Sequence, residues 1–213
     1  PGGFSNLPYQ IPMTSHQPTR QQLRRELRSR RRALSPQQQR RASRRLCRNL
    51  LASRELRDAR SIALYWPNDG EIDPRSLQPA VARMNKGCYL PVLHPVLGNR
   101  LWFLRQDRDT PMVRNRFGIP EPSLRRAASR PAWALDLILM PLVGFTERGD
   151  RLGMGGGFYD RTFEFLHHAA CHKPRLIGLA HECQRVATMP TASWDIPMDS
   201  IITDGGQYPV KHR

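Results

Sequence analysis

The sequence predicts an α/β fold, a single three-layer domain in which a mostly parallel sheet carries helices on both faces. Short apolar segments typical of strands alternate along the chain with longer segments of helical periodicity. A length of 213 residues suits one such domain with a hydrophobic core of its own. A glycine-rich loop also stands between an apolar run and a helical run, an order that α/β sheets use to bind ligands.

The N-terminal half begins with two predicted helices, separated at Ser35-Pro36, because serine is a good N-cap and proline fits the first turn that follows. Leu23 and Leu27 give the first helix a narrow apolar stripe. The turn at residues 67–70 ends the first strand. We expect helices at residues 20–33, 36–53 and 73–84, and strands at residues 61–66, 88–93 and 101–105, the last of them at an edge.

In the C-terminal half, proline and arginine interrupt any periodicity over residues 106–134, so we expect an irregular segment there. Residues 135–140 form an apolar run that predicts a buried strand. The remaining expectations are a helix at residues 158–168 and strands at residues 175–180 and 200–203.

The charge of the chain is strongly positive and unevenly distributed. The net charge is +16, and residues 20–60 hold fifteen arginines against three acidic residues. Such a surface favours polyanions, either a nucleic acid or a small ligand with several phosphates or carboxylates. The sequence has no apolar run of membrane-spanning length, so we expect no membrane partner.

The cysteines predict a reducing compartment, the cytoplasm, because Cys47, Cys88, Cys171 and Cys183 form no CxxC pair. The histidines at 167, 168 and 172 lie near Cys171 and could bind a metal or end a helix. No second ligand pair accompanies them, which favours the polar helix end. Residues 1–13 are uncharged and rich in proline and glycine, so we expect a disordered extension before a single domain at residues 14–213.

The glycine-rich loop is the strongest candidate site. Four of the five residues from Gly153 to Gly157 are glycines, whose backbone amides can converge on a phosphate. Arg151 and Arg161 flank the loop, and Asp160 offers a carboxylate for Mg²⁺. The spacing matches neither the Walker nor the dinucleotide-binding pattern. A flexible surface turn is the alternative, but the preceding strand and the flanking charges favour a phosphate site.

Several separated segments resemble the 5-formyltetrahydrofolate cyclo-ligase (5,10-methenyltetrahydrofolate synthetase) family. Its signature is similar to residues 140–145 followed by residues 151–161. The arginine-rich first helix, the acidic turn after the first strand, the loop at residues 115–122 and Trp194-Asp195 stand in the order that the family has. The resemblance extends over residues 20–204.

The resemblance implies an enzyme that closes 5-formyltetrahydrofolate to 5,10-methenyltetrahydrofolate with ATP and Mg²⁺, releases ADP and phosphate, and phosphorylates the formyl oxygen. It implies ATP-binding roles for Arg20, Arg24, Arg151, Leu152, Gly153, Met154, Gly155, Gly156, Gly157, Phe158 and Tyr159. It implies substrate contacts from Trp66, Glu71 and Phe158, and metal ligands at Asp160 and Asp195.

Plainer roles compete with these assignments. Asp160 can be a first-turn helix carboxylate and Asp195 a loop cap, while Trp66 and Tyr159 can be packing residues. The chain also departs from some family members, which carry lysine at position 156 and tyrosine at position 158. The basic segment leaves nucleic-acid binding as an alternative function, although the sequence has no RNA-stacking motif or zinc finger. A folate with a poly-glutamate tail is also a polyanion and a candidate form of the substrate.

Overall fold

A computed structural model describes residues 18–124, 128–168 and 173–210 of the protein. The expected extension at residues 1–13 lies outside these ranges, as do Cys171 and His172. No described helix is long and apolar enough to cross a membrane.

The centre of the fold is a sheet of eight strands in the order β12-β11-β10-β7-β1-β2-β3-β6. The five strands from β11 to β2 are parallel, and antiparallel strands flank them on both sides. The strands are β1 (Ser61–Ala63), β2 (Gly87–Leu93), β3 (Leu101–Arg105), β6 (Ser129–Arg130), β7 (Leu137–Pro141), β10 (Arg175–Ala180), β11 (Ser200–Thr203) and β12 (Gln207–Pro209).

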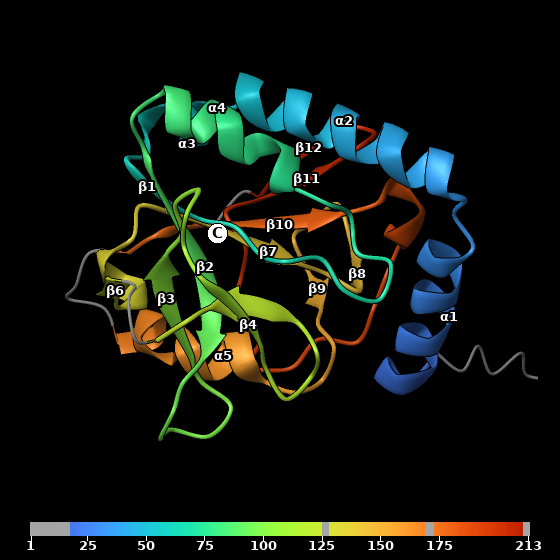
Figure 1. The fold of residues 1–213 in the computed structure, drawn as a ribbon. Coiled ribbons are helices and arrows are strands. Elements are labelled where there is room, and N and C mark those ends of the chain that lie inside the picture. Colours follow the sequence, from blue (N-terminus) through green and yellow to red (C-terminus); the bar gives the residue numbers. More distant parts are fainter. Residues whose placement is uncertain (1–17, 125–127, 169–172, 211–213) are drawn as a thin grey trace, which may run out of the picture.

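Helices cover both faces of this sheet, and Figure 1 shows α2, α3 and α4 on one face and α5 on the other. The α-helices are α1 (Arg20–Arg32), α2 (Pro36–Ala52), α3 (Arg54–Asp58), α4 (Gln78–Arg83) and α5 (Phe158–Thr162). Short 3-10 helices add η1 (Arg75–Leu77), η2 (Ala132–Ala134), η3 (Glu164–His168) and η4 (Glu182–Gln184). The α/β class with three layers is therefore confirmed.

Strand β7 shows how the sequence builds these layers. Its side chains alternate between the faces, so Leu137 and Leu139 join the core beneath α2 and α4, while Ile138 and Met140 join the core on the α5 side. All four are fully buried. A strand buried on both faces needs a continuous apolar run, and this one has it.

Helix α1 lies apart from the two layers, across the end of the sheet toward which β10 points (Figure 1). Thr19 begins the helix with a capping box closed by Gln22. Leu23 and Leu27 pack with Val143, Leu152 and Met189 in a small core of their own. The helix therefore covers segments that follow the carboxyl ends of the parallel strands.

The sheet has its topological switch point at β1. The chain passes from β1 to its neighbour β2, and later returns to the other side of β1 with β7. Ligands of open α/β sheets bind at such a point, outside the carboxyl ends of the strands. The turn after β1 and the loops after β7 both begin there.

Two hairpins stand outside the large sheet. One pairs β4 (Met112–Arg114) with β5 (Pro120–Pro122), and the other pairs β8 (Gly144–Phe145) with β9 (Arg151–Leu152). The second hairpin follows β7 directly and carries the glycine loop at the end of β9. It places that loop beside α1, because Leu152 packs against the apolar stripe of that helix.

Several boundaries differ from the expectations. Residues 106–134 are not irregular throughout, because tertiary pairing gives them β4, β5 and β6. Strand β3 is not the edge, since the two-residue β6 pairs with its outer side. The helix expected at residues 158–168 is α5 followed by η3, so its dipole is shorter than the sequence suggested. Helix α3 was not expected.

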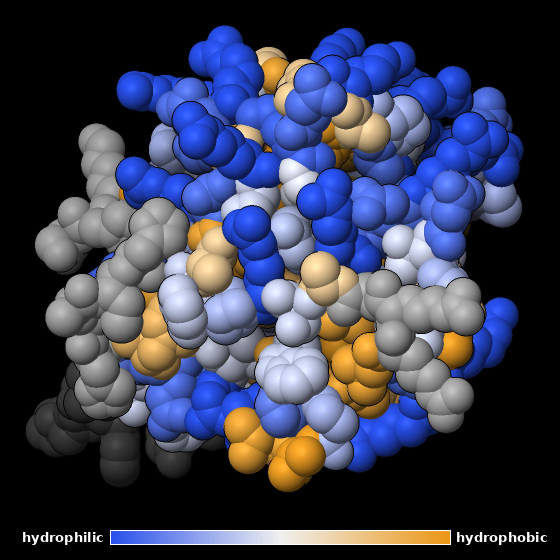
Figure 2. Space-filling model, turned by 60° about the vertical axis from the view of Figure 1, so that its left-hand side comes forward, coloured by the Kyte–Doolittle hydropathy of each residue, from blue (hydrophilic) through white to orange (hydrophobic). Residues whose placement is uncertain are grey.

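The surface over the helical layer of α2, α3 and α4 is strongly hydrophilic (Figure 2). Helix α2 contains no acidic residue, and its arginines recur so that they share one side of the helix. The exposed members are Arg40, Arg41, Arg44, Arg45 and Arg48. The opposite side of the helix carries the buried Ala42, Leu46, Cys47 and Leu50.

Candidate functional site

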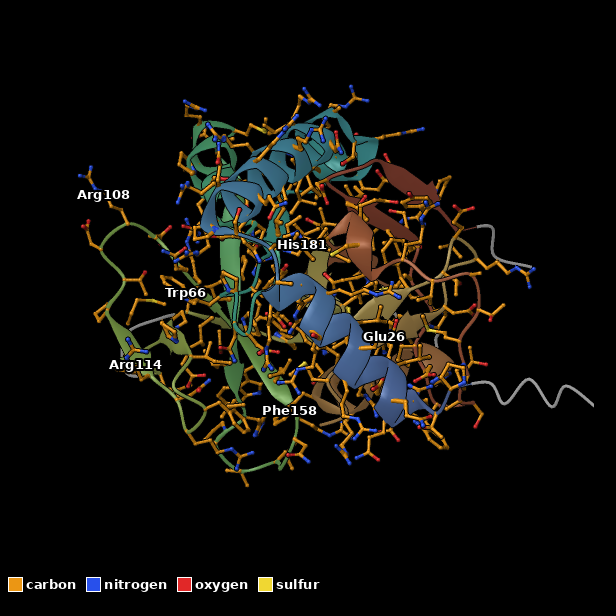
Figure 3. The ribbon with its side chains drawn as sticks, turned by 90° about the vertical axis from the view of Figure 1, so that its right-hand side faces the viewer. Glu26, Trp66, Arg108, Arg114, Phe158 and His181 are labelled. Carbon is orange, nitrogen blue, oxygen red and sulfur yellow. The ribbon has the colours of Figure 1, made fainter. Side chains whose placement is uncertain are left out.

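A cavity of about 860 Å³ lies between α1, the glycine loop and the loop before β11. Figure 3 looks onto this end of the molecule, where α1 crosses the front of the sheet. The lining residues are Arg20, Arg24, Gly153, Gly155, Gly157, Asp160, Arg161, Glu164, His167, Ser193, Trp194 and Asp195. The structure thus brings seven of the residues expected to bind ATP or metal to one cavity.

The glycine loop adopts a backbone that only glycine takes easily. Gly155 has φ +95° and Gly157 has φ +68°, and a methyl group at Gly155 would come within 3.3 Å of the Arg24 guanidinium carbon. Within the described residues, the amides of Gly155 and Gly156 donate no hydrogen bond to a protein acceptor. Free amides beside arginines can bind an anion.

Arg20 and Asp195 form a two-pronged ion pair at the wall of this cavity. The Nη1 atom lies 2.6 Å from Oδ2, and Nη2 lies 2.9 Å from Oδ1. Both side chains are largely buried. Asp195 also accepts a hydrogen bond of 2.8 Å from the amide of Ala192, which is the capping role that competed with metal binding.

Arg24 links α1 to the glycine loop directly. Its Nε donates a hydrogen bond of 2.9 Å to the carbonyl oxygen of Gly153. Partial burial, together with the nearby charge of Arg20, lowers the pKa of Arg24 from its usual value. Arg20 and Arg24 line the same cavity, as their spacing of four residues predicts.

Arg151 and Asp160 form a second ion pair, which connects β9 to the first turn of α5. Arg151 is 5% exposed, and its Nε also donates to the carbonyl oxygen of Ile196 at 2.8 Å. Its guanidinium is therefore held by the protein and is more buried than those of Arg20 and Arg24. Arg161, whose Nη1 donates to the Gly156 oxygen at 2.9 Å, lines the cavity instead.

Asp160 and Asp195 fit a Mg²⁺ ion that is bound mainly through phosphates. Both line one cavity, and each is paired with an arginine. No cluster of three or more His, Cys, Asp or Glu side chains suited to a metal occurs in the described part of the chain. Mg²⁺ commonly takes only one or two carboxylates together with water and substrate phosphates, so two carboxylates suffice.

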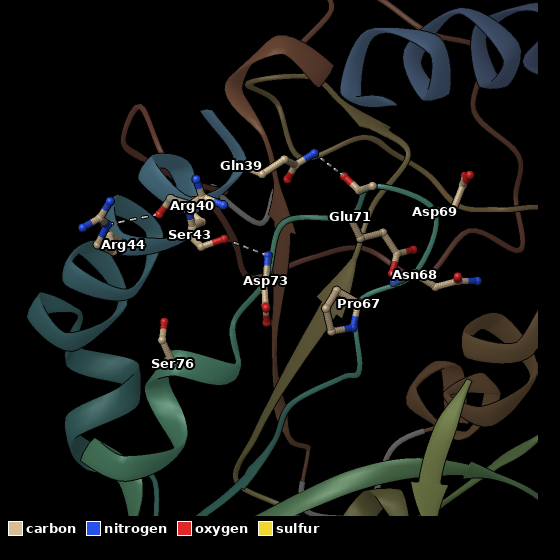
Figure 4. Close-up of a pocket in the computed structure, with 11 residues that line it drawn as sticks. Gln39, Arg40, Ser43, Arg44, Pro67, Asn68, Asp69, Glu71, Asp73 and Ser76 are labelled. Atoms are coloured by element: carbon tan, nitrogen blue, oxygen red, sulfur yellow. Dashed lines mark hydrogen bonds between the residues drawn. The ribbon is translucent and has the colours of Figure 1, made fainter. Parts of the chain in front are cut away.

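A second cavity, of about 820 Å³, opens between α2 and the turn that follows β1 (Figure 4). Helix α2 contributes Gln39, Arg40, Ser43 and Arg44, and the facing segment contributes residues 67–71, Asp73 and Ser76. Gln39 donates from Nε2 to the Gly70 oxygen at 3.3 Å, which ties the helix to the turn. Glu71, expected to bind substrate, lines this cavity and not the first one.

Glu71 has an unusual electrostatic position. Its side chain is 10% exposed, and its Oε2 accepts a hydrogen bond of 3.0 Å from the amide of Asn68. Burial raises the pKa of Glu71 from about 4.5 to about 7, although Arg31 and the Asn68 amide act in the opposite direction. The carboxylate therefore changes its charge near neutral pH.

The remaining expected residues lie near the site but outside both cavity linings. Trp66 packs against the core beneath α2, with the Arg75 guanidinium 4.5 Å from its ring centre. Tyr159 stacks on Phe163 with ring centres 6.0 Å apart, which is the packing role considered from the sequence. Leu152 is fully buried against α1, and Met154 and Gly156 are exposed.

Phe158 brings two of the family-like segments together. Its ring meets the ring of Phe117 edge to face, with centres 5.8 Å apart. Phe117 lies in the loop between β4 and β5, within residues 115–122, and is 53% exposed. An aromatic pair at this place can cover a planar ligand. No sequence pattern links these two positions, which lie about forty residues apart.

Sequence reasoning also missed a buried network behind the site. Asp69 binds three arginines of α1, namely Arg28, Arg31 and Arg32, and these hold the pKa of Asp69 at about 2. A signal for Arg31 existed, since it follows Leu23 and Leu27 at the same spacing and so falls on the buried stripe. His181, behind α1 in Figure 3, is also buried, and burial lowers its pKa to about 4.

Comparisons with known proteins concern the family and the fold of the chain. The model of the 5-formyltetrahydrofolate cyclo-ligase family matches residues 16–204. The 5-formyltetrahydrofolate cyclo-ligase of Haemophilus influenzae is 44% identical over 183 residues, covering 86% of this chain and 96% of the relative. That of Escherichia coli K12 is 40% identical over 177 residues, covering 83% and 96%.

A solved structure gives the same result for the fold. The Aquifex aeolicus 5,10-methenyltetrahydrofolate synthetase superimposes with a TM-score of 0.78 at 30% identity, and the match covers 91% of this chain and 94% of that one. The Mycoplasma pneumoniae enzyme of the same name shares the fold at 22% identity, with a TM-score of 0.68. With the family model matching most of its length, the chain belongs to the 5-formyltetrahydrofolate cyclo-ligase family.

Proposed function

We propose that the protein converts 5-formyltetrahydrofolate to 5,10-methenyltetrahydrofolate and consumes ATP, with Mg²⁺ as the metal. The observation that carries the proposal is the cavity beneath α1, where free loop amides, three arginines and three carboxylates meet in a member of this family. The residue types suit a nucleoside triphosphate, because they provide donors for phosphate oxygens and ligands for the metal.

The chemistry explains why a phosphate site is needed. An amide-type formyl oxygen is a poor leaving group, but it becomes a good one after it attacks the γ-phosphorus and ADP departs. The second folate nitrogen then attacks the formyl carbon and loses its proton, and phosphate leaves with the formyl oxygen. The protein has to align the formyl oxygen with the γ-phosphate and neutralise charge.

Arg20 and Arg24 are the residues that we assign to the phosphates. Both belong to α1 and line the cavity, and Arg24 is already fixed to the Gly153 carbonyl through its Nε. The guanidinium of Arg24 approaches Gly155, so it lies beside the free amides of the loop. A bound Mg²⁺ would neutralise phosphate charge, and Asp160 and Asp195 would hold it.

We assign Glu71 and Phe158 to the folate. A carboxylate can accept two hydrogen bonds from the N–H groups of an amino-pyrimidine ring, and Glu71 lies at the switch point of the sheet. Phe158 begins α5 at the end of the glycine loop, so it can cover the ring next to the phosphates. Trp66 stays a candidate contact, and its packing against the core supports a structural role as well.

The test is direct. Purified protein is incubated with 5-formyltetrahydrofolate, with and without ATP and Mg²⁺, while the absorbance of the methenyl product and the release of ADP are measured. We expect product only when both ATP and Mg²⁺ are present, with one ADP released for each product. A folded protein that binds ATP yet forms no product under these conditions would contradict the proposal.

We further propose that the second cavity favours folates with a poly-glutamate tail. Arg40 and Arg44 line it opposite the turn that carries Glu71, so a tail that leaves the folate site there meets two exposed arginines. The matched control is the pair Arg41 and Arg45, exposed on the same helix but outside the lining. Replacing Arg40 and Arg44 by glutamine should remove any preference for the long tail, whereas replacing the control pair should not.

Nucleic-acid binding remains the second candidate, favoured by the arginines that share one side of α2. None of the five exposed arginines forms an ion pair with a described acidic residue. Binding to duplex RNA at physiological ionic strength, lost on raising the salt, would support it.

We place the protein in the cytoplasm, which is consistent with the free thiols of Cys47, Cys88 and Cys183.

A further inference from the structure

Arg31 places a fully buried guanidinium behind the two cavities. It belongs to the buried side of α1, and its exposed fraction is 0%. Arginine is almost never fully buried unless its charge is paired and its donors are satisfied. The hydrogen bonds and ion pairs of the Arg31 side chain therefore indicate its role.

The guanidinium joins three segments of the site. Its Nε donates to the Asp69 carbonyl oxygen at 2.8 Å, and its Nη2 donates to Asp69 Oδ2 at 2.9 Å. Its Nη1 lies 3.3 Å from the carbonyl oxygen of Leu142, just after β7, and its Nη2 lies 3.7 Å from the sulfur of Met154 in the glycine loop. The turn after β1, the end of β7 and the glycine loop thus meet at one cation.

Two carboxylates lie beside Arg31, and they depend on it differently. Asp69 also pairs with Arg28 at 2.7 Å and with Arg32, so its charge keeps two other partners. Glu71 Oε1 lies 3.8 Å from Arg31 Nη2, and no second basic side chain of the described ranges forms an ion pair with Glu71. If Arg31 is lost, Asp69 therefore keeps two ion-pair partners, whereas Glu71 keeps none within the described ranges.

We propose that Arg31 is a positioning residue for folate binding, which holds the Glu71 carboxylate toward the N–H edge of the pterin and ties it to the glycine loop. This inference rests on the proposed function, in particular on the assignment of Glu71 to the folate. It explains why one arginine of α1 is fully buried while every other arginine of the helix is at least partly exposed.

The electrostatics support this geometry. Burial raises the pKa of Glu71 to about 7, and the positive charge of Arg31 opposes that increase. The other groups whose charge or titration acts on this region are Arg28 from α1, Asp69 from the same turn, Tyr65 after β1 and Tyr159 from α5. Without Arg31, a neutral Glu71 would present an O–H group to a pterin edge that itself offers donors.

The experiment measures the KM for 5-formyltetrahydrofolate at saturating ATP and Mg²⁺, and folate affinity without ATP by fluorescence. At pH 7.5 we expect Arg31→Met to raise the KM and the dissociation constant for folate at least about tenfold with a smaller change in kcat, because a neutral Glu71 loses its charge-assisted hydrogen bonds to the pterin. The defect should shrink toward pH 9, where Glu71 ionises without help. The matched control is Arg32→Met, which removes another partner of Asp69 and should leave folate binding unchanged.

A double-mutant cycle with Glu71→Gln separates positioning from general damage. If Arg31 acts through Glu71, adding Arg31→Met to Glu71→Gln costs little more folate affinity. Additive losses, or a pH-independent defect, would overturn the inference while the wild-type activity still stands. An inactive wild type would overturn the proposed function itself. If Arg31→Met does not fold, the same cycle with Arg31→Lys, which keeps the charge but not the fork, decides the question.

Discussion

The ion pair between Arg20 and Asp195 joins a residue assigned to phosphate with a residue assigned to the metal. To bind Arg20, ATP without Mg²⁺ must break this ion pair. Asp195, whose side chain is only 13% exposed, then loses its partner. ATP with Mg²⁺ satisfies both groups at once, because the phosphates take the arginine and the metal takes the carboxylate. The pair should therefore couple metal and nucleotide binding.

Replacing Asp195 by asparagine tests this coupling. Asparagine keeps an oxygen for the Ala192 amide but loses the charge that faces Arg20. Exposed pairs contribute less than about 1 kcal/mol, and hydrogen bonds to charged groups about 1.5–3 kcal/mol. At side-chain exposures of 24% and 13% we expect a loss of about 1–2 kcal/mol, or a Tm lower by about 2–8 °C.

Loss of an active-site residue usually weakens ligand binding, but loss of the Asp195 charge should strengthen the binding of ATP without Mg²⁺. Calorimetry should show that Asp195→Asn binds Mg²⁺-free ATP about 5- to 30-fold more tightly than the wild type, since the 1–2 kcal/mol that held Arg20 is no longer needed. With Mg²⁺ present, the variant should bind ATP more weakly than the wild type. Glu147→Gln, which removes the exposed pair with Arg185, is the control. A folded Asp195→Asn variant with weakened Mg²⁺-free ATP binding would refute the reasoning.

Three further predictions concern the same site. Glu71 has a folded-state pKa of about 7 against about 4.5 ordinarily, so its ionisation destabilises the fold as the pH rises from 4.5 to 7. Glu71→Gln should thus raise the Tm at pH 8 by a few degrees, but not at pH 4.5, while it weakens folate binding; equal Tm shifts at both pH values would contradict this. Wild-type folate affinity should improve between pH 6 and pH 8 with a midpoint near 7, and Glu71→Gln should abolish that dependence in a fluorescence titration. Gly155→Ala should lower the free energy of unfolding by about 1 kcal/mol in a denaturation assay and weaken ATP binding in calorimetry, because the φ of +95° at this position suits glycine alone. The control is Gly98→Ala, which has open space around it and should change neither quantity.

Local patterns were enough to predict the layers of the fold. The continuous apolar run that became β7 and the Ser35-Pro36 boundary between α1 and α2 follow from short-range chemistry. The pairing of β4 with β5, in contrast, depends on partners six to ten residues apart in a proline-rich segment, where periodicity is too weak to detect. Strand β6 owes its existence to β3, so nothing in its two residues could indicate it.

The candidate site, like the fold, could be predicted from the sequence only in part. The glycine loop and its flanking charges were visible in the sequence, because that chemistry is concentrated in one stretch. The separation of Glu71 from the nucleotide cavity was not visible, since it depends on how the turn after β1 packs against α2. Arg151 illustrates a further limit, because a charged residue beside a glycine loop can be used by the protein itself, here to hold Asp160 and the Ile196 carbonyl.

The position of α1 explains why these separate parts can work as one site. A doubly wound sheet leaves the carboxyl ends of its strands open at the switch point, and here a single helix covers that opening. One turn of the helix gives Arg20 and Arg24 to the phosphate cavity, and its last turn gives Arg31 to the Glu71 turn. Arg20, Arg24 and Arg31 thus give three points at which substitution can separate nucleotide binding from folate binding.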